Sequence, residues 1–185
     1  ATAEPFVLLD DARADGAAPA QLFTHPREVF VARRAGEVAD VLARADAARR
    51  DTGGILAGYC AYEAGLALEP KLAELADART GDSGPLIWLG LFDDTQSIAA
   101  DAVPAWIATR SEGTASLGPM EPQLSPGGYT EAFNALQDAI RAGDIYQANL
   151  TFPIDAVVRG RSEDLYGALA ARQQVDHGAL VLQEG

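Results

Sequence analysis

Short apolar runs, separated by turns or by segments of helical periodicity, restrict this chain to few folds. Each run has the length and the aromatic or β-branched content of a strand. The runs occupy residues 5–9, 29–32, 54–61, 85–92 and 178–183. We expect the first two to pair with each other, because only a loop rich in Ala, Gly and Pro separates them. The third, GILAGYCA, is apolar throughout and should be covered on both faces.

Three segments carry apolar residues at the spacing of an amphipathic helix. They begin at Glu37, Tyr129 and Ser162. Gly53 and Gly143 stand where a glycine ends the first and second helix. Ser162 is suited to cap the third, with Glu163 and Asp164 in its first turn, where the helix dipole favours acids.

Four further segments complete the expected order of elements. A short helix is predicted over 69–77, and 95–128 is predicted to be a loose connection that contains an edge strand at 105–109. A strand is predicted over 145–152. Hairpin-like neighbours then occur together with helical crossovers. This mixture predicts an α+β fold, a layered antiparallel or mixed β-sheet with helices packed on it.

The charge of the chain excludes some classes of partner. Acidic residues number 27 and basic residues 14, which gives a formal net charge of −13. Nucleic acid is not expected as a partner, because binding to phosphates depends on Lys and Arg. The same field repels anionic substrates, so a dianion would need a locally basic pocket.

The remaining composition indicates a cytoplasmic protein without a membrane or metal role. No apolar run approaches the roughly 18 residues that cross a bilayer, and no basic segment precedes the first apolar patch. Cys60, the single cysteine, lies in an apolar run and should be a buried, inert thiol. His25 and His177 have no Cys, Asp or Glu at metal-ligand spacing, so no metal site is expected.

The segment at 143–151, GDIYQANLT, is the most specific motif. In an extended chain, Gln147, Asn149 and Thr151 share one face and Tyr146 lies on the other. The polar face could reach a ligand in a cleft. Alternatively, the two amides could satisfy backbone groups where the strand enters its sheet.

Three blocks, in order, resemble the chorismate-using synthases, the anthranilate synthase component I family. The first two are GYCAYEAG at 58–65, followed by LEP, and WLGLFD at 88–93. The third is YTEAFNALQDAIRAGDIYQANLT at 129–151. The resemblance implies the N-terminal part of that fold, with an N-terminal subdomain over about 1–125 and the start of the chorismate-binding region over 126–185.

Within this family the aminodeoxychorismate synthase branch is the more similar. Its features here are VLLDDAR at 7–13 and AYEAGLALEP at 61–70. The resemblance implies amination of chorismate to 4-amino-4-deoxychorismate in para-aminobenzoate and folate biosynthesis. Ammonia would come from a glutamine amidotransferase component II, and some such synthases are fused to an aminodeoxychorismate lyase. Anthranilate synthase component I and a non-catalytic amino-acid-binding module remain alternatives.

A second implication concerns an effector pocket. In the family a Leu-Leu-Glu-Ser segment lines a tryptophan pocket, and the matching candidates here are Leu9, Asp10 and Asp11. A carboxylate replaces the serine, and Val175-Asp176 stand where the family has a Pro-aromatic pair. An acid here could hold an α-ammonium group, or the acids could simply form the turn that ends the strand.

The family keeps its catalytic groups in its C-terminal half. These are the chorismate pocket, the glutamates that bind magnesium, and a lysine proposed as a nucleophile. No such motif occurs up to Gly185. The resemblance therefore implies no catalytic residue and no magnesium ligand in this chain. A last strand with nothing after it to pair with also suggests a fragment, which alone should be inactive.

Overall fold

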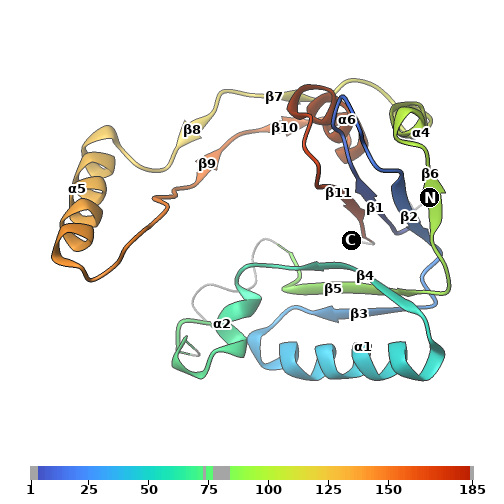
Figure 1. The fold of residues 1–185 in the computed structure, drawn as a ribbon, viewed down its shortest axis with the longest axis horizontal. Coiled ribbons are helices and arrows are strands. Elements are labelled where there is room, and N and C mark those ends of the chain that lie inside the picture. Colours follow the sequence, from blue (N-terminus) through green and yellow to red (C-terminus); the bar gives the residue numbers. More distant parts are fainter. Residues whose placement is uncertain (1–3, 73, 77–83, 184–185) are drawn as a thin grey trace. The chain divides into compact units, whose positions relative to one another are not determined.

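The computed structural model describes residues 4–72, 74–76 and 84–183 of the chain (Figure 1). The fold divides into two compact units. Unit 1 contains the chain up to Arg110 and resumes at Tyr166, and unit 2 is the segment Ser111–Leu165 between them. Among the described residues, no helix is both long and apolar enough to span a membrane.

One sheet of unit 1 joins strands from both ends of the chain. Its antiparallel order is β11-β1-β2-β6. The strands are β1 (Phe6–Asp10), β2 (Ala20–Thr24), β6 (Gln96–Ile98) and β11 (Gly178–Leu182). The expected pairing of β1 with 29–32 is wrong, because the chain returns earlier as β2, within the stretch that composition marked as a loop.

The other sheet of unit 1 has the antiparallel order β3-β5-β4. Its strands are β3 (Glu28–Ala32), β4 (Ile55–Cys60) and β5 (Ile87–Phe92). The predicted strands at 54–61 and 85–92 are thus present, but β4 is an edge strand and only Ala57 of it is buried. The expectation of a strand covered on both faces is wrong for this reason. Cys60, expected to be buried, is exposed at its end.

Side chains that alternate along each strand build the core of unit 1 in layers. Val7 of β1 and Phe23 of β2 face the other sheet, where they meet Trp88 and Phe92 of β5 in a cluster between the sheets. Phe6 and Leu8 face the opposite way, toward helices. The result is two face-to-face sheets with helices on their outer faces, which confirms the α+β prediction.

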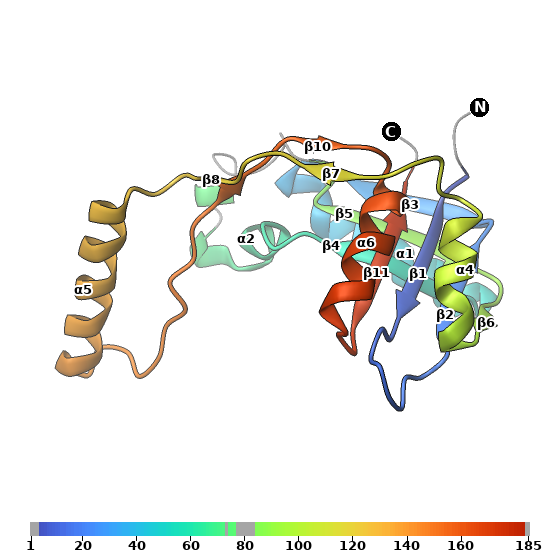
Figure 2. The same cartoon turned by 90° about the horizontal axis from the view of Figure 1, so that it is seen from above.

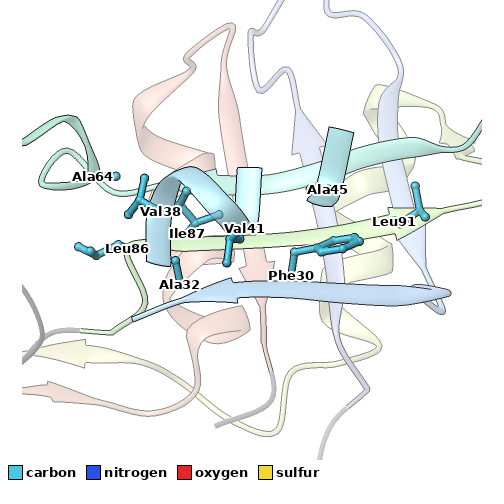
Figure 3. Packing of buried hydrophobic residues seen from close by; sticks show 9 residues of the cluster. All are labelled: Phe30, Ala32, Val38, Val41, Ala45, Ala64, Leu86, Ile87 and Leu91. Carbon is cyan, nitrogen blue, oxygen red and sulfur yellow. The ribbon is translucent and has the colours of Figure 1, made fainter. Parts of the chain in front are cut away.

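Helices cover the outer face of each sheet. Under the β3-β5-β4 sheet, α1 (Val38–Thr52) buries Val38, Val41 and Ala45 against Phe30 and its neighbours (Figure 3). Over the other sheet lie α4 (Val103–Ala108) and α6 (Ser162–Gln173), as Figure 2 shows. The prediction of α1 is confirmed, with Gly53 in the left-handed conformation at its end.

Two local predictions between 62 and 109 need correction. The predicted helix at 69–77 corresponds to a 3₁₀ turn, Pro70–Leu72, and to helical residues 74–76, whereas Ala73 and Asp77 lie outside the described residues. A preceding helix, α2 (Ala64–Leu68), was not predicted. The predicted edge strand at 105–109 is wrong: Val103 and Ile107, four apart, lie on the buried face of helix α4.

Unit 2 is an antiparallel ribbon that carries helix α5 (Pro126–Ala142). The ribbon pairs β7 (Ser116–Leu117) with β10 (Val158–Arg159), and β8 (Glu121–Pro122) with β9 (Ile154–Asp155). The predicted helix is confirmed. Ser125 accepts a hydrogen bond from the Gly128 amide at its start, and Gly143 is left-handed at its end.

The predicted strand at 145–152 is wrong. This segment is irregular, and the backbone is paired across the ribbon only from Pro153 onward, with β9 beginning at Ile154. The ring of Phe152 packs edge-to-face on Tyr129, which holds the segment against α5 instead of in a ladder. The ribbon strands opposite are already paired with β9 and β10.

Candidate functional site

Two segments contain the candidate site residues, one in each unit. The first is the end of β1, with Leu9, Asp10 and Asp11. The second is the segment after α5, with Tyr146 and its neighbouring amides.

Asp10 lies at the end of β1 opposite Gly178 of β11. It is buried, and the Tyr166 hydroxyl donates a hydrogen bond to its Oδ2 at 3.2 Å. Gly178 makes room for this contact, because a Cβ there would lie 2.5 Å from the Tyr166 hydroxyl. Burial raises the pKa of Asp10, and burial together with the Asp10 charge raises the pKa of Tyr166.

Asp11 organises the loop that follows β1. Its Oδ1 accepts a hydrogen bond from Arg13 Nε at 2.9 Å, and its Oδ2 accepts from Arg13 Nη2 at 2.6 Å and from the Ala18 amide at 2.8 Å. These bonds hold the pKa of Asp11 well below its usual range. Both carboxylate oxygens therefore have partners within the chain.

The three β1 candidates do not converge on one point. Alternation along β1 places Leu9, which is 39% exposed, on the face opposite Asp10. Asp10 instead meets Tyr166, and Asp11 meets Arg13. Sequence reasoning missed both partners. The position of Arg13, two residues beyond an acid, could have signalled its contact, whereas Tyr166 is 156 residues from Asp10.

Asp10 and Asp11 should affect stability with opposite dependence on pH. The lowered pKa means that Asp11 stabilises the fold above the unfolded value of about 3.9, and this contribution is lost as the pH falls through the folded value. Asp11→Asn should therefore destabilise the chain at about pH 7, and by progressively less as the pH falls below about 4 toward the folded value. Urea unfolding across this range measures the difference.

The contribution of Asp10 to stability depends on pH in the opposite direction. Because its folded pKa is raised, ionisation opposes folding, and the cost appears as the pH rises from the unfolded pKa through the folded value. Asp10→Asn should remove this cost and flatten that part of the pH profile. Parallel pH profiles for the two variants would contradict the assignment.

The second segment exposes its polar side chains. Tyr146 is 93% exposed, and Gln147 and Asn149 are exposed as well. Within the described part of the chain, neither amide side chain makes a hydrogen bond. The structure thus leaves the side chains of Gln147 and Asn149 accessible to a ligand.

A metal centre is not formed by the residues that the structure describes. No group of three His, Cys, Asp or Glu residues lies close enough together among them to hold an ion. His25 contacts Thr24 and Glu4, and His177 contacts the Asp176 carbonyl.

Comparison with known proteins identifies the family. The chorismate binding enzyme family matches residues 4–185, nearly the whole chain. A search of curated proteins finds no match. Because this match covers far more than half of the chain, the chain belongs to the chorismate-binding enzyme family.

Proposed function

We propose that this chain is part of an aminodeoxychorismate synthase component I. Membership of the chorismate-binding enzyme family supports chorismate as the substrate. The reaction would replace the 4-hydroxyl group of chorismate by an amino group, with ammonia supplied by a glutamine amidotransferase component II. Anthranilate synthase is the competing activity within the same family.

The hydrogen bonds of Asp11 are the observation that favours aminodeoxychorismate synthase over anthranilate synthase in this proposal. Anthranilate synthases more often have Leu-Leu-Glu-Ser where this chain has Leu8-Leu9-Asp10-Asp11. Here the last position is a carboxylate whose oxygens are bound by Arg13 and the Ala18 amide. Because partners within the chain already occupy both oxygens of Asp11, this segment supports a structural role. This is expected of a synthase that tryptophan does not inhibit through this segment.

We place Tyr146, Gln147 and Asn149 at the edge of the substrate cleft of the enzyme. Their exposure supports this role. A side chain that served only to pack the core would be shielded from water, whereas these three are open to a ligand. Amide groups can hydrogen-bond the carboxylates and hydroxyl of chorismate. The described residues offer no ligand set for the magnesium ion that the family uses, so we place its ligands elsewhere in the enzyme.

The product identifies the activity. The gene product that carries this chain, given chorismate, ammonium and magnesium, should form 4-amino-4-deoxychorismate, which chromatography and mass spectrometry distinguish from anthranilate. Formation of anthranilate would assign the competing activity. Absence of any product, with a melting temperature raised by an amino acid, would favour the binding module.

Variants in the same assay test the cleft residues. Asn149→Ala and Gln147→Ala should each lower kcat/KM for chorismate about 10-fold, the effect of one lost hydrogen bond of about 1.4 kcal/mol. Their melting temperatures should not change, since both side chains are exposed. Asn134→Ala, at an exposed asparagine of α5, is the matched control and should retain full activity. Equal activity of Asn149→Ala and Asn134→Ala would remove Asn149 from the cleft.

A further inference from the structure

A cluster of charged residues lies at the base of unit 2, where its two ends meet. It consists of Ser111, Glu112, Arg161, Glu163 and Asp164, here called the basal cluster. The first two residues begin unit 2, and the other three lie at its end. The cluster thus joins segments that are separated along the chain by α5 and the whole ribbon.

Asp164 connects the two ends by hydrogen bonds. Its Oδ1 accepts a bond from the Ser111 hydroxyl, and its Oδ2 accepts from the Arg161 amide at 3.2 Å. The second bond satisfies a backbone donor at the start of α6, which begins at Ser162. Because α6 begins at Ser162, this serine is the first helical residue, and its predicted role as the cap is wrong. The bond from Ser111 and those from nearby backbone amides lower the pKa of Asp164.

Arg161 connects the same two ends through its ion pair with Glu112, and it also pairs with Glu163 at its own end. Its Nη1 lies 2.7 Å from Glu112 Oε1, and its Nη2 lies 2.6 Å from Glu163 Oε1. Glu163 is only 3% exposed, so its charge depends on this guanidinium. Burial raises the pKa of Glu163, but the bond from Arg161 and other contacts outweigh burial and lower it. Removal of Arg161 would leave a buried carboxylate without a cation.

The ribbon above the cluster has little other support. Each paired strand is two residues long, and all eight of these residues are exposed. Isolated two-stranded ribbons are marginally stable in water. The backbone bond from the Gly118 amide to the Val157 carbonyl, 2.8 Å long, belongs to this exposed ladder.

We propose that the basal cluster is a clasp that closes the ribbon of unit 2 and ties its opening to the first turn of α6. Because Asp164 serves both the ribbon base and the helix start, the two open together. The opening is local, and the sheets of unit 1 stay formed while it occurs.

Hydrogen exchange on the 185-residue chain tests the clasp. Arg161→Met should speed exchange of the Gly118 and Leu165 amides at least about 10-fold, the effect of losing one charge-assisted bond. The Leu165 amide reports the first turn of α6, since it donates to the Arg161 carbonyl. Amides in β5 should exchange as in the parent chain.

Arg159→Met is the matched control. Arg159 is an exposed arginine of β10 and makes no ion pair in the described part of the chain. Its loss should leave all three sets of amides unchanged. Equal effects of the two substitutions would overturn the clasp, as would faster exchange throughout β5. Ser111→Ala removes only the neutral donor to Asp164, so it should speed exchange of the same amides by a smaller factor. This variant tests the proposal if Arg161→Met does not fold.

Discussion

Gly58→Ala should strongly destabilise unit 1. A Cβ at this position would lie 2.1 Å from the Trp88 carbonyl oxygen and 3.0 Å from Leu89 Cα. Both atoms belong to the central strand β5, which cannot move without disturbing β3 on its other side. The φ angle of 152° adds strain for any residue with a side chain. We expect a loss of more than about 4 kcal/mol in the free energy of unfolding, a large share of the roughly 5–15 kcal/mol typical of a domain.

Urea unfolding followed by tryptophan fluorescence measures this loss, because Trp88 lies in the affected sheet. Gly65→Ala is the matched control. A Cβ at Gly65, in helix α2, meets nothing within 4 Å, and alanine favours a helix by about 0.5–1 kcal/mol over glycine. An unchanged midpoint for Gly58→Ala would contradict the close approach of β4 and β5.

Phe30→Ala should have the second largest effect. Phe30 is 1% exposed and fills the space between α1 and the β3-β5-β4 sheet, beside Val41 and Leu91 (Figure 3). Truncation removes the ring and leaves a cavity, which costs about 3–5 kcal/mol for a buried phenylalanine.

Phe133→Ala separates this cavity effect from the mere loss of a ring. Phe133 lies on α5 and is 44% exposed, so its truncation should cost less than about 1 kcal/mol. The two variants are compared by thermal unfolding of the chain. Similar losses in both would show that α1 does not pack on the sheet through Phe30.

Local signals in the sequence predicted the elements that depend on local interactions. Helices α1 and α5 follow from apolar spacing, and Gly53 and Gly143 end them in the left-handed conformation. Strand β5 follows from a continuous apolar run, which its central position explains. The failures concern contacts between distant segments. Edge and central strands of similar composition, such as β4 and β5, cannot be distinguished without knowing which strands pair.

The candidate site shows the same division. Asp10 and Asp11 stand out in the sequence as two acids that end a strand, and both are at the end of β1. Their opposite pKa shifts depend on Tyr166, which is distant, and on the geometry of Arg13. The segment at 143–151 identified the family correctly, although its predicted strand is absent, because residue identities and backbone conformation are separate kinds of information.

Unit 1 is built from two stretches of the chain with unit 2 between them, and this arrangement affects the order in which its strands pair. Strand β1 lies between β2, its neighbour in the chain, and β11, the last strand described. The hairpin of β1 and β2 can form early, but β11 must find β1 across a loop that includes all of unit 2, and closing so long a loop is slow. During synthesis, one edge of the first strand therefore stays open until Gly178–Leu182 have left the ribosome.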